Sequence, residues 1–282
     1  MKISALTANF VAEIEDINLS AINGSEFEQL YTAWLKYGVL RIRNQQLDDA
    51  QLQTFSKRFG PLEEAPFGRM SEADKAKIKN RYITTLSNIT VDGKPIGGLG
   101  NSEATWHSDM TYIENPPPAS LLLGIEIPDE GGDTHFANQY AALDALPSKL
   151  RNRISQLTLK HNAAHTSIGK LRPGYEPFDD PRQAPGAIHP LIKTHSESGK
   201  PALFLGRREW AYIPGLSVPE SEALLDEIWS YAALAENTWT QKWQPMDLII
   251  WDNRCVMHRR DGFDDNSRRY MRRCQVLNRS TQ

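Results

Sequence analysis

Short apolar segments, separated by glycine, proline and polar turns, recur along the whole chain. Apolar residues that alternate with a period of two, or that form short continuous runs, are typical of strands. They predict strands at residues 12–17, 38–43, 82–89, 105–112, 119–127, 133–137, 191–194, 202–205, 247–251 and 270–277. Apolar residues at helical spacing predict helices at residues 25–37, 48–59, 140–157 and 219–235.

Many short strands with a few flanking helices favour a mainly β fold, either a sandwich or a jelly roll. A dinucleotide-binding fold would need regular strand–helix alternation and a glycine fingerprint, and the sequence has neither. We expect one domain over residues 1–282. Residues 62–81 are mixed and charged, and residues 163–186 are rich in glycine, proline and charge. We expect these two segments to be loops that cover an active site.

The composition is that of an ordinary globular protein, with 40% hydrophobic and 24% charged residues. A net charge of −3 and a pI near 6.2 argue against nucleic acid as the main partner. No apolar run approaches the length of a membrane span or of a signal peptide core, so we expect a cytoplasmic protein without a membrane partner. A homo-oligomer is compatible with the sequence. Cys255 and Cys274 lie in apolar segments outside any Cys-x-x-Cys motif, which predicts small buried side chains.

The expected strand at residues 105–112 carries a histidine and an aspartate two positions apart. Side chains at i and i+2 of a strand share a face, so His107 and Asp109 project together and Ser108 points the other way. One imidazole and one carboxylate are two of the three ligands of a facial triad for ferrous iron, which leaves three positions open. His258, which follows an apolar strand, is the candidate third ligand. The same pair could also be a simple ion pair at a strand end.

A second pattern of charge lies on the last expected strand. Arg269, Met271 and Arg273 share one face, and Arg268 and Arg272 lie on the other. If the first face points inward, its two guanidinium groups lie about 13 Å apart along the strand. Buried arginines persist where they are paired, so this arrangement predicts two anions in the cavity. A solvated basic strand is the alternative.

Four segments together resemble one known family. Residues 106–109 (WHSD), 131–134 (GGDT), 251–258 (WDNRCVMH) and 269–273 (RYMRR) are similar to the taurine dioxygenase and 2,4-dichlorophenoxyacetate dioxygenase family of Fe(II)- and 2-oxoglutarate-dependent oxygenases. The resemblance spans almost the whole chain and also includes residues 59–63 (FGPLE) and 189–195 (HPLIKTH). Residues 86–89 (LSNI) and 92–94 (DGK) resemble the chlorophenoxyacetate branch more closely than the taurine branch.

The resemblance implies a distorted jelly roll, the cupin-like double-stranded β-helix, and a role for each motif residue. His107, Asp109 and His258 would bind Fe(II). Thr134 and Arg269 would hold the distal carboxylate of the co-substrate 2-oxoglutarate. The second co-substrate would be O2, with succinate and CO2 as co-products. The implied reaction is hydroxylation of a small molecule, which can cleave an adjacent C–O, C–N or C–S bond.

The resemblance also implies that Arg273 reaches the anionic group of a carboxylate or sulfonate substrate. Asp109 favours hydroxylation, because related halogenases carry a small residue in place of this carboxylate. The chain departs from the family at Glu103, where relatives often carry asparagine. Glu103 is therefore either a solvated loop carboxylate or a contact for a cationic or hydrogen-donating part of the substrate.

Two other functions remain open from the sequence. One is a cupin-like isomerase or hydrolase that uses Zn or Mn, and the other is a metal-free anion-binding barrel. The isomerase or hydrolase does not require Thr134, Arg269 and Arg273 together, and in the metal-free barrel His107 and Asp109 would form an ordinary ion pair. His135 follows Thr134 and should face the opposite side of its strand, so we expect it to be structural.

Overall fold

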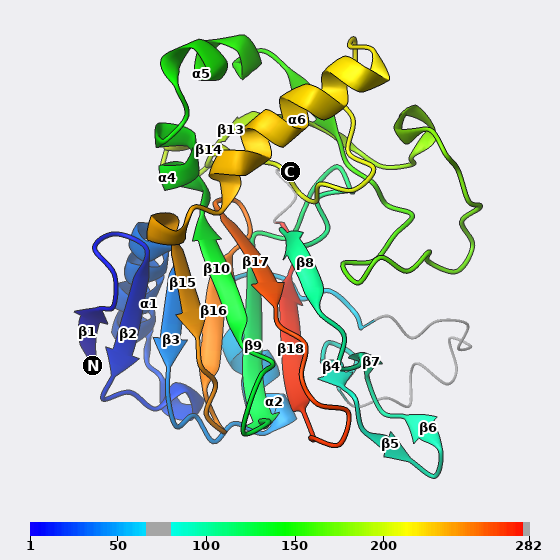
Figure 1. The fold of residues 1–282 in the computed structure, drawn as a ribbon. Helices are drawn as coiled ribbons and strands as arrows, with labels where there is room; N and C mark the ends of the chain where they lie inside the picture. Colours follow the sequence, from blue (N-terminus) through cyan, green and yellow to red (C-terminus); the bar gives the residue numbers. More distant parts are fainter. Residues whose placement is uncertain (66–79, 279–282) are drawn as a thin grey trace.

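The computed structural model describes residues 1–65 and 80–278, and its main feature is a pair of β-sheets (Figure 1). The large sheet has the strand order β1-β2-β3-β16-β9-β18-β4-β7. Its strands are β1 (Lys2–Ala5), β2 (Val11–Glu15), β3 (Val39–Ile42), β16 (Leu248–Asp252), β9 (Ala119–Glu126), β18 (Tyr270–Val276), β4 (Thr84–Ser87) and β7 (Gly98–Leu99). Except for β2–β3 and β4–β7, neighbouring strands pair antiparallel.

The smaller sheet has four antiparallel strands in the order β15-β10-β17-β8. They are β15 (Thr238–Gln241), β10 (Thr134–Asn138), β17 (Val256–Arg260) and β8 (Ala104–His107). Three further strand pairs are β5 (Thr90–Val91) with β6 (Lys94–Pro95), β11 (Thr158–Lys160) with β12 (Ile188–Pro190), and β13 (Ile192–Thr194) with β14 (Pro201–Leu203). Neither main sheet closes into a barrel within the described residues. A mainly β fold with flanking helices is therefore confirmed.

The helices begin where the sequence supplies capping residues. The described α-helices are α1 (Gly24–Tyr37), α2 (Asp49–Ser56), α4 (Gln139–Asp144), α5 (Ser148–Ile154) and α6 (Val218–Ala232), with short 3-10 turns η1 (Leu19–Ala21), η2 (Pro181–Gln183) and η3 (Ala235–Asn237). Asn23, Asp48 and Ser217 each form a capping box with the residue three positions on. Helix α1 ends at Gly38, whose φ of 80° is left-handed and favours glycine.

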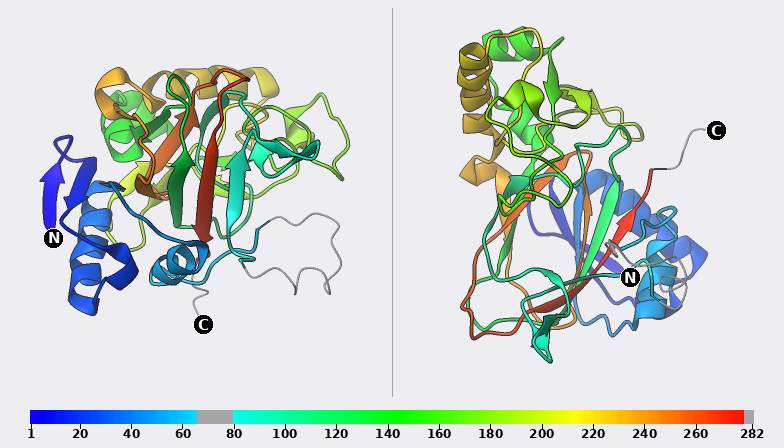
Figure 2. Two further views of the ribbon diagram at one scale, coloured as in Figure 1. Left: turned by 90° about the horizontal axis from the view of Figure 1, so that it is seen from below. Right: turned by 90° about the vertical axis from the view of Figure 1, so that its right-hand side faces the viewer.

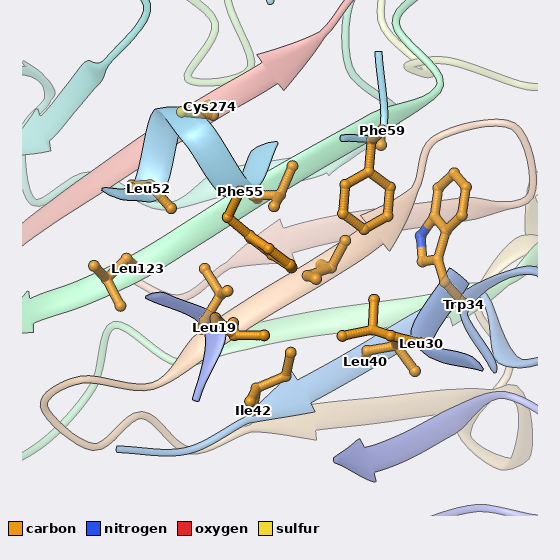
Figure 3. Close-up of a cluster of buried hydrophobic side chains, with 14 of the residues drawn as sticks. Leu19, Leu30, Trp34, Leu40, Ile42, Leu52, Phe55, Phe59, Leu123 and Cys274 are labelled. Carbon is orange, nitrogen blue, oxygen red and sulfur yellow. The ribbon is translucent and has the colours of Figure 1, made fainter. Parts of the chain in front are cut away.

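The central strands of the large sheet are buried on both faces, which explains their continuous apolar sequences. On β9, Leu121 and Leu123 point to the outer face, where α1 and α2 cover the sheet. Figure 3 shows this outer cluster, in which Trp34 and Phe55 of the helices lie over the strands. Leu122 points the other way, into the cluster between the two sheets. The alternation leaves one inner face on which a site can form.

The remaining helices cover a different part of the molecule. Helices α4, α5 and α6 enclose a second apolar cluster beside the small sheet. In Figure 2, α1 and α2 (blue) lie on one side of the large sheet, away from α4–α6. Among the described residues, no helix is both long and apolar enough to cross a membrane.

Two expected elements differ from the structure. The helix predicted at 140–157 is two helices, α4 and α5, because Pro147 cannot continue a helix and disfavours helical geometry at Leu146. The strand predicted at 105–112 ends at His107, and the chain turns at Met110, whose φ is 50°. Residues 163–186 contain no helix or strand other than the turn η2, as expected for a loop. Most of the other predicted loop, 62–81, lies outside the described residues.

Candidate metal centre

The two predicted ligand histidines come together because their strands pair. His107 ends β8 and lies directly opposite His258 of β17 in the antiparallel register. Their ring centroids are 4.2 Å apart. Asp109 follows in the turn after β8, and its Oδ1 lies 3.8 Å from His107 Nε2 and 4.0 Å from His258 Nε2. The three side chains therefore meet because β8 pairs with β17 and the chain turns after His107. The i, i+2 spacing expected on a single strand is not what brings them together.

The protonation states of these residues suit metal binding. Nδ1 of His107 donates to the main-chain oxygen of Thr105 at 2.7 Å, so the lone pair of Nε2 faces Asp109. Burial lowers the pKa of His107, and burial with repulsion from His107 lowers the pKa of His258 to about 3. Burial acts to raise the pKa of Asp109, but Arg273 and the two imidazoles hold it below its usual value. The cluster therefore offers two neutral imidazoles and one carboxylate.

The donor set fits a divalent metal with open positions. The three ligand atoms of His107, Asp109 and His258 lie within 4.8 Å of one another. Ligands at about 2.1 Å from one ion, at right angles, would lie about 3 Å apart, so the two distances from Asp109 Oδ1 to the imidazoles, 3.8 and 4.0 Å, exceed that spacing by about 1 Å. Two imidazoles and a carboxylate with open positions are the ligands of non-haem Fe(II) oxygenases.

The three side chains line a cavity of about 440 Å³ between the two sheets. Thr134 of β10 and Arg269, just before β18, line the same cavity. Trp243 Nε1 donates to Thr134 Oγ1 at 3.0 Å. Because an indole nitrogen only donates, the threonine hydroxyl keeps its own proton free for another acceptor.

Arg269 is a buried cation whose nearby carboxylate, Asp133, acts to raise its pKa without forming an ion pair with it. Its side chain is 2% exposed, and it forms no ion pair with any residue in the described ranges. Its Nε has no hydrogen-bond partner there. Burial, with repulsion from Arg260, lowers the pKa of Arg269 to about 9. A buried guanidinium is stable only when an anion compensates it, so the cavity is built to receive one beside Thr134.

The inner face of β18 carries a second cavity-lining arginine. Arg273 Nη1 lies 3.5 Å from Asp109 Oδ1, so this guanidinium borders the candidate ligands. The opposite face points outward, where Arg268 pairs with Glu126 and Arg272 with Asp49. The side with Arg269 and Arg273 therefore faces the cavity, and the side with Arg268 and Arg272 does not.

A family profile described as "Taurine catabolism dioxygenase TauD, TfdA family" matches residues 2–275. The chain belongs to this family. The resemblance inferred from the sequence motifs is thereby confirmed.

Individual TauD/TfdA relatives cover nearly the full chain. The alpha-ketoglutarate-dependent 2,4-dichlorophenoxyacetate dioxygenase of Cupriavidus pinatubonensis is 32% identical over 278 residues, covering 95% of this chain and 94% of that protein. The (S)-phenoxypropionate/alpha-ketoglutarate-dioxygenase of Sphingobium herbicidovorans is 30% identical over 275 residues, covering 95% and 92%. The crystal structure of AAD-2 with Mn(II) and N-oxalylglycine matches with a TM-score of 0.80 at 29% identity, covering 99% and 98%. The likeness to the chlorophenoxyacetate branch is also confirmed.

The residue that departs from the TauD/TfdA pattern lies outside the cavity. The Glu103 side chain is 63% exposed, and its Oε1 lies 3.4 Å from Arg259 Nη1. It is not among the residues that line the cavity. The geometry therefore favours the solvated carboxylate over the substrate contact. His135 also points away, with Nε2 2.6 Å from Asp261 Oδ2, which agrees with the structural role expected for it.

Several cavity residues were missed by the sequence analysis. Arg207 and Arg172 reach the cavity from loops, and neither forms an ion pair within the described residues. Arg207 donates to the main-chain oxygens of Asn162, at 3.0 Å, and Thr166. Glu63 also lines the cavity, and burial raises its pKa. No period or motif marks these residues, because their loops reach the site only in the folded chain.

Proposed function

We propose that the protein is an Fe(II)- and 2-oxoglutarate-dependent dioxygenase that hydroxylates a small anionic substrate. Its scaffold would be a distorted jelly roll made of the two facing sheets. His107, Asp109 and His258 would hold the iron, and Thr134 and Arg269 the distal carboxylate of 2-oxoglutarate. When bound, the metal and 2-oxoglutarate would activate O2, with succinate and CO2 as co-products.

The observation that carries this proposal is that the guanidinium of Arg269 is buried and forms no ion pair within the described residues. Two neutral imidazoles and one carboxylate leave Fe(II) with one net positive charge. The 2-oxoglutarate dianion would reverse that charge, and Arg269 would restore neutrality while gripping a carboxylate through two nitrogens. Thr134 would add a hydrogen bond from its free proton. N-Oxalylglycine, present with Mn(II) in AAD-2, differs from 2-oxoglutarate only by NH in place of one CH2, which supports this assignment.

The substrate would bind on the other side of the ligand cluster. Arg273 borders Asp109 and has an Nε without a hydrogen-bond partner in the described part of the chain. An acidic group on the substrate would pair with this guanidinium and place a neighbouring carbon near the metal. Relatives named for phenoxyacetate, phenoxypropionate and sulfate ester substrates share this preference for anions. The loop at 163–186 supplies Thr166, Ser167 and Arg172 to the cavity and would cover the bound substrate.

Anaerobic titration tests the proposal. The Fe(II)-loaded protein should develop a visible charge-transfer band when 2-oxoglutarate is added without O2. In air, a panel of small carboxylates and sulfonates should then include a compound that raises succinate release above the uncoupled rate. An isomerase, a hydrolase or an anion-binding barrel would show neither signal. Absence of the charge-transfer band in the wild-type protein would refute the dioxygenase.

A further inference from the structure

A buried serine lies directly behind the candidate aspartate ligand. Ser120 is on β9 between Trp251 of β16 and Gln275 of β18 in the sheet register, and its side chain is fully buried. Its hydroxyl donates to Asp109 Oδ2 at 2.8 Å. Ser120 is also the one polar residue in the otherwise apolar stretch 119–123. Its position and contact show that it serves Asp109 rather than the apolar core.

The direction of this hydrogen bond follows from the residues behind it. Trp251 Nε1 lies 2.8 Å from Asn253 Oδ1, and an indole nitrogen can only donate. The amide oxygen of Asn253 is therefore the acceptor, and its Nδ2 points to Ser120 Oγ at 3.0 Å. Because an amide nitrogen also only donates, the serine oxygen must accept this bond. The serine proton is then directed to Asp109.

The chain of bonds gives the two oxygens of Asp109 different tasks. Oδ2 is occupied by the Ser120 hydroxyl, whereas Oδ1 is the oxygen that faces His107 and His258. We propose that Ser120 and Asn253 are positioning residues that restrict Asp109 to binding a metal through one oxygen. A carboxylate that bound through both oxygens would take a position needed by 2-oxoglutarate or O2.

This inference rests on the proposed function, and it goes beyond it by assigning roles to residues that do not touch the metal. Ligating carboxylates are commonly held by hydrogen bonds, and loss of such a partner typically costs about 10- to 100-fold in metal affinity or activity. The structure adds a specific expectation. Loss of the serine bond should weaken 2-oxoglutarate binding more than metal binding, because the freed Oδ2 competes for a co-substrate position and not for the metal itself.

Three variants test the bond and its direction. Ser120→Ala removes the hydroxyl, and Ser120→Thr retains it. Asn253→Asp keeps the shape of the side chain but puts an acceptor where Nδ2 was, so the serine proton should turn away from Asp109. Ser221→Ala is the matched control, because Ser221 lies on α6 and is equally buried, but its hydroxyl accepts from Ile213 N at 2.9 Å.

The measurements are the Kd of Mn(II) for the apoprotein, the Kd of 2-oxoglutarate for the Mn(II) protein, and the anaerobic Fe(II)–2-oxoglutarate band. Ser120→Ala and Asn253→Asp should raise the 2-oxoglutarate Kd about 10-fold and weaken the band, with a smaller change in the Mn(II) Kd. Ser120→Thr and Ser221→Ala should bind 2-oxoglutarate as the wild type does.

Two results would overturn the inference. One is an unchanged 2-oxoglutarate Kd in Ser120→Ala, whether or not its Tm falls, because Ser120 would then only fill space. The other is wild-type behaviour of Asn253→Asp, which remains informative if Ser120→Ala does not fold. Failure of the wild-type protein to bind 2-oxoglutarate at all is a different outcome, because it would refute the proposed function itself.

Discussion

Replacement of Arg269 by methionine tests whether the buried guanidinium binds the distal carboxylate of 2-oxoglutarate, as we propose. Arg269 is 2% exposed, so no solvent can replace it as a partner for the bound 2-oxoglutarate. Removing one member of a buried ion pair costs about 3–5 kcal/mol. The hydroxyl of Thr134 would remain as a partner, so we take the lower value. A loss of about 3 kcal/mol raises the Kd of 2-oxoglutarate on the order of 100-fold.

The same substitution should have the opposite effect on the protein without co-substrate. The folded state lowers the pKa of Arg269 to about 9, whereas in the unfolded chain the pKa of this guanidinium returns to its ordinary, higher value. The charged form therefore opposes folding at every pH below the folded pKa, and this penalty is fully present at pH 7. Arg269→Met removes the penalty, so the Tm of the apoprotein should rise while the increase in Tm caused by 2-oxoglutarate disappears.

Both effects can be measured on one set of proteins. Anaerobic titration of the Fe(II) protein gives the Kd of 2-oxoglutarate, and thermal unfolding of the Mn(II) protein with and without 2-oxoglutarate gives the shift in Tm. Arg268→Met is the matched control, because Arg268 is the preceding residue but is 62% exposed and pairs with Glu126. If Arg269→Met binds 2-oxoglutarate within about threefold of the control, the assignment of the guanidinium to the co-substrate is wrong.

Three further predictions concern the other cavity residues. His258→Ala should lose stoichiometric Fe(II), measured as metal content after anaerobic reconstitution, and retained iron would contradict its role as a ligand. Arg273→Met should raise the KM of the best substrate about 10-fold or more while the Kd of 2-oxoglutarate changes little, because a substrate acid loses a charged partner worth about 1.5–3 kcal/mol. Trp243→Phe removes the donor to Thr134 Oγ1, so the hydroxyl can rotate away from the cavity. The Kd of 2-oxoglutarate should then rise about fivefold, the effect of about 1 kcal/mol, and an unchanged Kd would show that Trp243 does not orient the hydroxyl.

The sequence was sufficient where local periodicity and strand pairing agree. The period of two predicts that Arg269 and Arg273 share one side, and both line the cavity, Arg269 from just before β18 and Arg273 from within it. His258 follows a strand whose apolar residues mark it as central, and β17 pairs with β8 so that His258 lies opposite His107. Only the arginine spacing is a relation within one short segment, because His258 meets His107 through the pairing of two strands distant in the sequence.

The sequence was insufficient where a side chain depends on a partner far along the chain. Glu103 lies four residues before His107, but the surface position beside Arg259 follows from the pairing of β8 with β17. Ser120 is a single serine in an apolar run. Its role follows only from its hydrogen bonds with Asp109 and Asn253, which lie in other segments of the chain. Such residues carry no local signal, because their role is a contact between strands.

The charges of the cavity give a physical reason for the proposed preference for anionic substrates. Five arginines and three carboxylates line it within the described residues, which is a surplus of two positive charges. Iron(II) and the 2-oxoglutarate dianion would add equal and opposite charges, so the surplus would persist in the proposed complex that meets the substrate. A neutral ester of an accepted acid would offer Arg273 no charged partner beyond Asp109, whose Oδ1 lies 3.5 Å from Arg273 Nη1. We therefore expect discrimination against the ester to come from the lost charge of the substrate acid, and not from shape alone.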